Sequence, residues 1–383
     1  MLKVMISVGE ASGDLHGASV AEALKKLEPS AKLFGMGGST MRTAGVEINF
    51  DIADLGVIGF VEVIRNLPRL FKLRDQLAEL MVRERPDVLV IIDYPDFNIR
   101  LAKIAKKLGI PVVSYIPPTA WAWRRGRAKE VAKTVERVAS IFPFEAEVYQ
   151  EAGANVTFVG NPSLDIVKST MTKEEAYQYF DADPAKRIIL LMPGSRNQEI
   201  INLLPVMLEA AEKVCQKAPD CQFYIPVAST ISREILQNIV SEFNISVKFT
   251  TDKNYDLMNI STASIVASGT ATLETALMAL PTVIIYKLAT ITYWLGRLLV
   301  KVPYFGLPNI IAGRKVVPEL LQNEANSENI ANEVLKMLND SIVRQQIVSD
   351  LIEVKTKLGQ YGAIERVAKV ILEVAEANHG GTS

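Results

Sequence analysis

Two acidic turns are the places where this chain can carry out acid–base chemistry. The first is Gly9–Asp14, which carries Glu10 directly after an apolar strand expected at Leu2–Val8. The second begins at Asp93, which closes an unbroken apolar run. Desolvation at the end of a buried strand raises the pKa of a carboxyl, and a carboxyl tuned in this way can act as a general base. We therefore expect Asp93 to be a base, with Glu10 as its rival.

The composition of the Gly9–Asp14 turn also indicates what it binds. It lacks the G-x-G-x-x-G dinucleotide fingerprint, and its acids would repel an anion but accept hydrogen bonds from the hydroxyls of a sugar. Ser12 and Asp14 are therefore candidate acceptor ligands. The structural alternative is that Ser12 or Asp14 only caps the following helix. For Asp93 the alternative is a salt bridge, with Asp96 capping the next helix.

Two turns in the second half have the opposite chemistry. Gly194–Arg196 carries a cation and no acid at a strand–helix junction, which suits a phosphate. Ser268–Glu274 offers hydroxyls at a helix start and an acid one turn later, which suits a ribose. An ordinary strand–helix loop with a surface arginine is the structural alternative. Together the two turns predict a nucleoside-diphosphate site made of Gly194, Ser195, Arg196, Ser268, Gly269, Thr270, Ala271, Thr272 and Glu274.

Apolar and basic residues alternate in three further segments. Trp121, Trp123 and Arg124 suit a sugar or an anionic headgroup, because indole rings stack and guanidinium groups bind phosphate. Residues 55–74 are apolar with interleaved Arg and Lys, a pattern that favours an anionic membrane surface, and 293–301 is similar. A core helix with a charged outer face is the structural alternative. The candidate lipid contacts in residues 55–74 are Phe60, Val61, Leu70 and Phe71.

The elements that must position these residues alternate strand and helix twice along the chain. This rhythm predicts an α/β fold with two Rossmann-like domains, each built on a parallel sheet, facing a cleft, with C-terminal helices packing back across the domains. The end of the chain, 327–377, is expected to be helical throughout. The domains are expected at 1–170 and 185–350, followed by a C-terminal helical segment at 351–383. Strands are expected at 2–8, 32–36, 88–93, 111–116, 139–142, 156–159, 188–192, 222–226, 247–250, 264–267 and 282–286.

The bulk composition narrows the classes of function. The chain has 383 residues, 49% of them hydrophobic, which is enough for two cores. Lys and Arg number 42 against 43 Asp and Glu, so a nucleic-acid partner is not expected. Two cysteines without ligand spacing and two histidines predict no metal and no cofactor, and they fit a reducing, cytoplasmic setting. No apolar run reaches the roughly 20 residues that span a bilayer.

Taken in order, these segments closely resemble the lipid-A-disaccharide synthase family of inverting glycosyltransferases, which have the GT-B fold. The resemblance runs from Val4 to about Glu324. One departure is Asn161, which precedes Pro162 where family members commonly carry His. The matching motifs are residues 9–14, 92–98, 121–124, 142–145, 191–196, 267–274, 307–314 and 317–320.

The resemblance implies a reaction and a role for several residues. The enzyme would join UDP-2,3-diacylglucosamine to 2,3-diacylglucosamine 1-phosphate (lipid X), invert the configuration and release UDP, in lipid A biosynthesis. The N-terminal domain would hold the acceptor and the C-terminal domain the UDP-sugar. Asp93 would take the proton from the acceptor 6-hydroxyl, Arg314 would join the UDP site, and Asn309 would hold a phosphate or sugar hydroxyl near the reacting carbon. The protein would be peripheral on the cytoplasmic face of the inner membrane, as a monomer or a homodimer.

Two other kinds of function compete with this one. A UDP-N-acetylglucosamine 2-epimerase is expected to have more histidines and acids in its cleft. The peptidoglycan lipid-intermediate transferase is expected to have several Gly-Gly-rich loops near the N-terminus. The chain shows neither pattern clearly. A non-catalytic nucleotide-sugar or lipid-binding protein needs no base, so turnover that survives Asp93→Asn would favour it.

Overall fold

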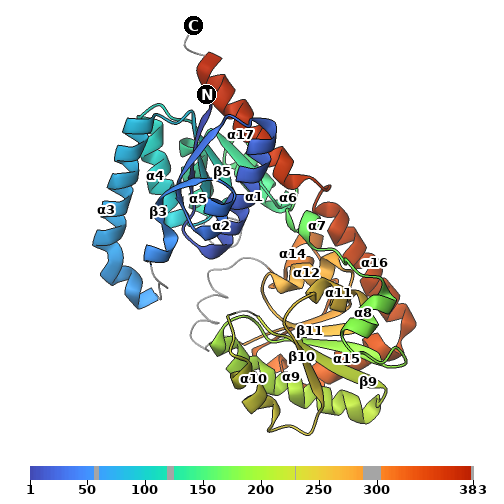
Figure 1. The fold of residues 1–383 in the computed structure, drawn as a ribbon. Helices are drawn as coiled ribbons and strands as arrows, with labels where there is room; N and C mark the ends of the chain where they lie inside the picture. Colours follow the sequence, from blue (N-terminus) through green and yellow to red (C-terminus); the bar gives the residue numbers. More distant parts are fainter. Residues whose placement is uncertain (56–59, 119–124, 229, 288–302, 381–383) are drawn as a thin grey trace. The chain divides into compact units, whose positions relative to one another are not determined.

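The chain folds into two compact units. The computed structural model describes residues 1–55, 60–118, 125–228, 230–287 and 303–380, without the side chains of residues 54, 55, 60–67, 125, 379 and 380. Unit 1 comprises Met1–Pro162 together with Gly359–Ser383, and unit 2 comprises Ser163–Leu358. The chain therefore leaves unit 1 once and returns to it at its end (Figure 1).

Unit 1 is built on a seven-stranded sheet whose described pairings are all parallel, in the order β3-β2-β1-β4-β5-β6-β7. The central strand β4 consists of five buried aliphatic residues, as expected for a strand covered on both faces. The strands are β1 (Lys3–Ser7), β2 (Lys32–Gly37), β3 (Glu47–Asp51), β4 (Val88–Ile92), β5 (Val112–Tyr115), β6 (Arg137–Ser140) and β7 (Val156–Phe158).

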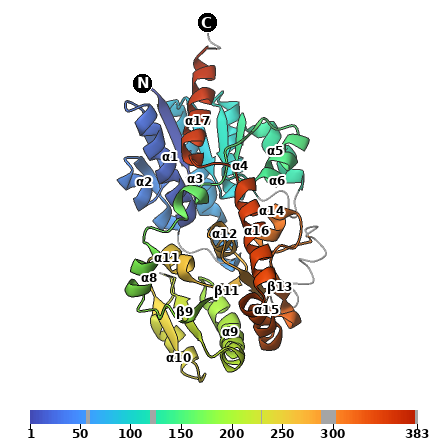
Figure 2. The same cartoon turned by 90° about the vertical axis from the view of Figure 1, so that its right-hand side faces the viewer.

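Helices cover both faces of this sheet, because successive strand residues point to opposite sides. Val88, Val90 and Ile92 pack into the core formed with α1 (Ala11–Leu27) and α17 (Ala363–Gly380), which lie side by side (Figures 1 and 2). Leu89 and Ile91 pack into the core on the other face. The remaining helices of unit 1 are α2 (Ser39–Thr43), η1 (Ile52–Leu55), α3 (Phe60–Glu84), α4 (Pro95–Lys107), α5 (Arg125–Thr134) and α6 (Pro143–Glu151).

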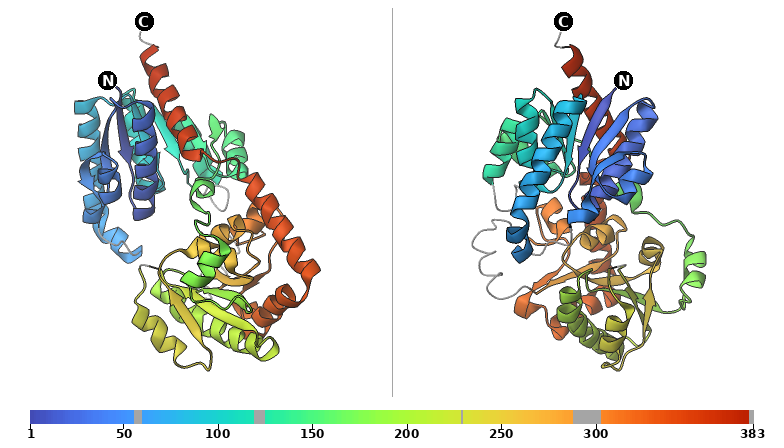
Figure 3. Two further views of the ribbon diagram at one scale, coloured as in Figure 1. Left: turned by 45° about the vertical axis from the view of Figure 1, so that its right-hand side comes forward. Right: turned by 60° about the vertical axis from the view of Figure 1, so that its left-hand side comes forward.

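Unit 2 repeats the architecture with a six-stranded parallel sheet, in the order β10-β9-β8-β11-β12-β13. Its strands are β8 (Arg187–Met192), β9 (Cys221–Pro226), β10 (Val247–Thr250), β11 (Ala263–Ala267), β12 (Thr282–Tyr286) and β13 (Glu319–Leu321). Its helices are α7 (Ser163–Ile166), α8 (Lys173–Tyr179), α9 (Asn197–Lys217), α10 (Arg233–Val240), α11 (Asn254–Ile260), α12 (Ala271–Leu277), α14 (Leu307–Ala312), η2 (Gln322–Glu324), α15 (Ser327–Asn339) and α16 (Ser341–Lys357). Within this unit α9 packs against α15, and α12 and α14 pack against α16 (Figure 3). The predicted α/β fold with two parallel sheets is confirmed.

The C-terminal segment is helical, as predicted, and it divides at two breaks into α15, α16 and α17. Asp340 ends α15 and caps α16, because its side chain accepts hydrogen bonds from the backbone N–H groups of Ile342 and Val343. The second break contains Gly359 and Gly362, whose positive φ values of 94° and 85° stop a right-handed helix. This break lets α17 join unit 1 rather than unit 2.

Two strands were missing from the sequence prediction. They are β3 and β13, which lie at one edge of their respective sheets. Both carry acidic residues and neither contains a fully buried position, so they lack the apolar run that marked the central strands. Their pairing with β2 and β12 decides their conformation.

Candidate active site

The carboxyl edge of the unit 1 sheet presents Asp93 from a strained turn. Asp93 and Tyr94 follow β4 with positive φ values of 50° and 48°, a left-handed conformation that few non-glycine residues adopt. The Asp93 side chain is partly buried, and burial raises its pKa. The Tyr94 backbone N–H and the nearby His16 oppose that rise. A carboxyl with a raised pKa at this position is chemically suited to accept a proton at neutral pH.

Glu10 and Asp14 lie in the turn after β1 but have different surroundings. Glu10 is exposed at the N-cap position of α1 and makes no side-chain capping bond. Asp14 is buried and accepts hydrogen bonds from the backbone N–H groups of Gly38, Thr40 and Met41 at 2.6, 2.9 and 3.2 Å. Asp14 therefore caps α2 and not its own helix, while Ser12 is exposed on the first turn of α1. Of these residues Glu10 and Ser12 are accessible to a ligand.

Five of the predicted acceptor and lipid contacts lie outside the described residues or side chains. Trp121, Trp123 and Arg124 fall in the gap 119–124, and the side chains of Phe60 and Val61 are among those not described. The described part of α3 includes Leu70, which packs against the core, and Phe71, which is 39% exposed.

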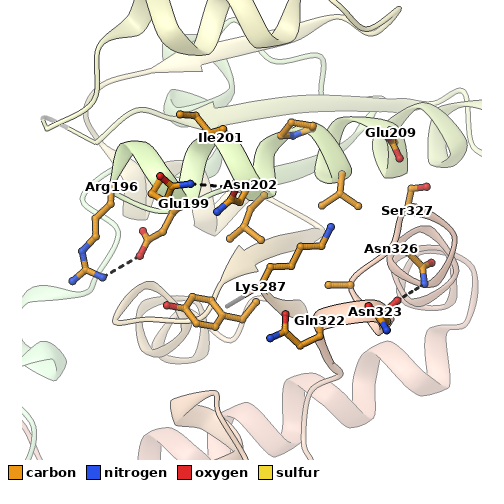
Figure 4. A pocket seen from close by; sticks show the side chains of 16 residues that line it. Arg196, Glu199, Ile201, Asn202, Glu209, Lys287, Gln322, Asn323, Asn326 and Ser327 are labelled. Atoms are coloured by element: carbon orange, nitrogen blue, oxygen red, sulfur yellow. Dashed lines mark hydrogen bonds and ion pairs between the residues drawn. The ribbon is translucent and has the colours of Figure 1, made fainter. Parts of the chain in front are cut away.

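At the carboxyl edge of unit 2, the loop after β8 already binds an anionic group. Gly194 has a φ of 112°, and the following Ser195 N–H donates to a Glu199 carboxylate oxygen at 3.1 Å. Arg196 is 78% exposed and pairs with the other Glu199 oxygen at 3.1 Å (Figure 4). The carboxylate of Glu199 thus lies at the N-terminus of α9, where the helix dipole and free N–H groups attract negative charge.

A pocket of about 1070 Å³ extends from Arg196 along the N-terminal half of α9 to the start of α15 (Figure 4). Lys287, which directly follows β12, adds a second cation to its wall. Side-chain amides supply most of the remaining polar groups, from Gln198, Asn202, Gln322, Asn323 and Asn326. Sequence reasoning missed Lys287, although its place immediately after a predicted strand was a usable signal.

The Ser268–Glu274 turn does not line this pocket in the described part of the chain. Ser268 Oγ donates to the Phe305 carbonyl, and the buried Thr272 hydroxyl donates to the Gly269 carbonyl at 2.7 Å. Glu274 accepts a hydrogen bond from the Tyr255 hydroxyl at 3.2 Å, and burial raises the Glu274 pKa. Gly269 and Thr270 are exposed, with Ala271 beside them at the start of α12.

Asn309 and Arg314 make bonds that differ from the roles expected of them. Asn309 is fully buried, and its amide oxygen accepts the backbone N–H groups of Val316 and Val317 at 2.6 and 3.0 Å. Its amide nitrogen donates to the Val317 carbonyl and to Glu319 at 2.9 and 2.7 Å. The Asn309 side chain therefore orders the segment that leads into β13.

Arg314 is held at the surface by α16. Its guanidinium donates to Asp350 at 3.0 Å and to Glu353 at 2.7 Å, and these two carboxylates raise its pKa. Within the described ranges, no group of three His, Cys, Asp or Glu side chains is arranged to hold a metal ion.

Two units, each built on a parallel Rossmann-like sheet, define a protein of the GT-B-like fold class. Solved structures with this fold include the UDP-GlcNAc 2-epimerase from Neisseria meningitidis bound to UDP-GlcNAc, at a TM-score of 0.67 and 13% identity, covering 97% of this chain and 100% of that one. MurG from Acinetobacter baumannii matches with a TM-score of 0.62 and 15% identity, covering 97% and 99%. At these identities the likeness shows the fold alone.

The sequence comparisons identify the family within that class. The lipid-A-disaccharide synthetase family model matches residues 4–372. The lipid-A-disaccharide synthase of Geobacter sulfurreducens is 43% identical over 372 residues, 97% of each chain. That of Nitrosococcus oceani is 41% identical over 378 residues, 99% of this chain and 97% of its own. The chain belongs to the lipid-A-disaccharide synthase family and is a glycosyltransferase of lipid A biosynthesis.

Proposed function

We propose that this enzyme transfers the 2,3-diacylglucosamine unit of its UDP-sugar donor to the 6-hydroxyl of 2,3-diacylglucosamine 1-phosphate, with inversion. The observation that carries the residue assignment is the position of Asp93. It is a partly buried carboxyl at the end of the central strand of unit 1, and burial raises its pKa. An inverting transfer needs one base beside the attacking hydroxyl, and this carboxyl has the required chemistry.

The proposed step is a single displacement. Asp93 accepts the proton of the acceptor 6-hydroxyl while that oxygen forms a bond to the anomeric carbon of the donor. The bond from the anomeric carbon to the β-phosphate oxygen breaks, and UDP leaves with the electron pair. Because the nucleophile enters opposite the leaving group, the configuration inverts.

The donor is assigned to unit 2, where Arg196 and Lys287 offer positive charge. Arg196 lies at the N-terminus of α9, and among the described residues its guanidinium pairs with the carboxylate of Glu199. A diphosphate would replace that carboxylate on Arg196 and on the loop N–H groups. Preorganised cations and N–H groups of this kind stabilise the charge that develops on the leaving UDP.

The decisive experiment is a reconstituted assay with the purified protein and both lipid substrates. We expect UDP release that requires the two substrates together, and a disaccharide 1-phosphate product with inverted anomeric configuration. UDP release from the donor alone, or no UDP release when both substrates are present, would overturn the proposal. Interconversion of UDP-N-acetylglucosamine with its 2-epimer would favour the epimerase alternative.

We also propose that the enzyme works at an anionic membrane surface. No helix in the described part of the chain has the length and apolar content needed to cross a bilayer. Phe71 on α3 is exposed, and the guanidinium groups of Arg74 and Arg100 lie 5.1 and 5.5 Å from the centre of its ring. An exposed aromatic ring flanked by cations suits the interface of an anionic bilayer.

Flotation with vesicles that contain anionic lipid tests this second proposal. Phe71→Ser should reduce the floated fraction, and salt should reduce binding of the wild type, because the basic contribution is screened. Val82→Ser is the matched control, since Val82 is an exposed aliphatic residue near the other end of the same helix. Equal flotation of both variants and the wild type would contradict the assignment of α3 to the membrane.

A further inference from the structure

A buried amide joins the ends of two neighbouring strands beneath the turn that carries Asp93. Asn98, on the first turn of α4, is fully buried, as is Ser7 at the end of β1. The Ser7 hydroxyl donates to the Asn98 amide oxygen at 2.7 Å. The Asn98 amide nitrogen donates to the carbonyls of Asp93, Ser7 and Ile92 at 2.8, 3.2 and 3.3 Å.

The hydrogen bonds of Asn98 reach the turn formed by Asp93 and Tyr94, whose backbone conformation is unfavourable. Asp93 and Tyr94 are two consecutive left-handed residues, and neither is glycine. Such a conformation persists only where surrounding contacts determine it, and it is often found at functional sites. The Asn98 side chain binds the carbonyl of the first of these residues, and its backbone N–H donates to the carbonyl of the second at 3.0 Å.

The turn is also fixed from the side of β1. Gly9 lies so close to the Tyr94 ring that an added Cβ would stand 2.2 Å from its carbons. Glycine is therefore required for this packing. The turn that bears Glu10 and the turn that bears Asp93 are thus in contact through Gly9 and Tyr94 and are bonded through Ser7 and Asn98.

We infer that Asn98 is a positioning residue for the transfer reaction, and that with Ser7 it sets the direction in which the Asp93 carboxylate meets the acceptor hydroxyl. This inference rests on the proposed function, because it takes Asp93 as the base. Asn98 acts through the backbone of Asp93 and does not itself touch the reacting atoms. A carboxylate side chain cannot take its place, because an ionised Asp has no hydrogen to donate to the three carbonyls.

Asn98→Ala tests the inference with a readout that a purely structural role would not move. Releasing the turn should lower kcat by about 10- to 100-fold, since small misplacements of a catalytic group cost rates of that order. The affinity for UDP, which is assigned to unit 2, should stay unchanged. The acidic limb of the kcat/KM profile should move to lower pH. Burial raises the Asp93 pKa against the opposing effects of His16 and the Tyr94 N–H, and an Asp93 released from its turn loses that burial.

Three companion variants keep the result decisive. Ser7→Ala removes only the bond to the Asn98 oxygen, so it should change kcat in the same direction by a few-fold, and it serves if Asn98→Ala does not fold. Asn98→Asp should resemble Asn98→Ala. Val131→Ala truncates a fully buried residue of α5 in the same unit and controls for lost stability, with kcat and the pH profile expected to match the wild type.

The outcomes separate this inference from the proposed function. Wild-type kcat and pH profile in both Asn98→Ala and Ser7→Ala, with Asp93→Asn inactive, would overturn the positioning role and leave Asp93 as the base. Full activity of Asp93→Asn would overturn the assignment of Asp93 as the base, on which this inference rests, and no disaccharide formation by the wild type would overturn the proposed function itself. A loss of activity in Val131→Ala equal to that in Asn98→Ala would show that stability alone explains the effect.

Discussion

The turn after β4 in unit 1 and the loop after β8 in unit 2 both follow an inner strand at the carboxyl edge of a parallel sheet, yet their chemistry is opposite. The first presents a partly buried acid, Asp93, on a left-handed turn fixed by a buried amide. The second presents an exposed cation, Arg196, at a helix N-terminus beside a glycine. A base needs desolvation to raise its pKa, whereas a phosphate ligand needs a charge that stays ionised and accessible. One architecture thus supplies either group, depending on the burial and charge of the loop.

The strongest test of this comparison is Asp93→Asn, which removes the base and keeps the shape of the side chain. We expect kcat to fall about 100-fold or more, within the range for loss of a general base, while the affinity for UDP is unchanged. Asp96→Asn is the matched control, because the Asp96 side chain is 82% exposed three residues away. A similar kcat in the two variants would remove Asp93 from the chemistry.

The unit 2 side of the comparison is tested by Arg196→Ala. Loss of a charge-assisted bond to the diphosphate should cost about 1.5–3 kcal/mol, which weakens UDP binding roughly ten- to hundredfold in calorimetry. Arg314→Ala is the informative partner, because Arg314 is paired with Asp350 and Glu353 on α16. We expect it to lower the melting temperature slightly and leave UDP affinity intact. The reverse ranking of the two variants would place the diphosphate near Arg314.

Glu10→Gln separates the two acids of unit 1. Glu10 is exposed and makes no capping bond, so we expect it to contribute to acceptor binding and not to proton transfer. The variant should raise the KM for the acceptor several-fold, because the Gln amide oxygen still accepts a hydrogen bond but without the charge, with a smaller change in kcat. Glu22→Gln makes the same change at an exposed position later on α1. A larger fall in kcat than that of Asp93→Asn would make Glu10 the base.

The smallest expected effect concerns a buried acid that lies outside the reaction. Glu145, on the first turn of α6, accepts a hydrogen bond from Ser140, and burial raises its pKa to about 8 from 4.5. The folded state therefore keeps a proton that the unfolded state releases, so the free energy of unfolding falls as pH rises from about 4.5 to about 8. Glu145→Gln should flatten this fall in pH-dependent melting curves. The exposed Glu147→Gln should leave it unchanged, and identical curves for both would contradict the assignment.

Departures from the predicted roles follow from contacts between distant parts of the chain. Asp14 was expected to bind a ligand or cap its own helix, but it caps α2. Asn309 was expected near the reacting carbon, but its amide is used by Val316, Val317 and Glu319. A side chain with spare hydrogen-bonding capacity looks the same in a sequence as one whose capacity is already used. Only the fold shows which partners reach it.

The sequence by itself determined the two-sheet α/β architecture, the family and the location of acids and cations at strand ends. These follow from short-range patterns, since an apolar run followed by a glycine turn and a helix is encoded within some 15 residues. The tertiary structure decided the left-handed turn at Asp93, the hydrogen bond between Ser7 and Asn98, and the pocket lined by both Arg196 and Lys287. Each of these depends on groups from separate strands and helices, and their pairing is fixed by sheet order and burial rather than by neighbouring residues in the chain.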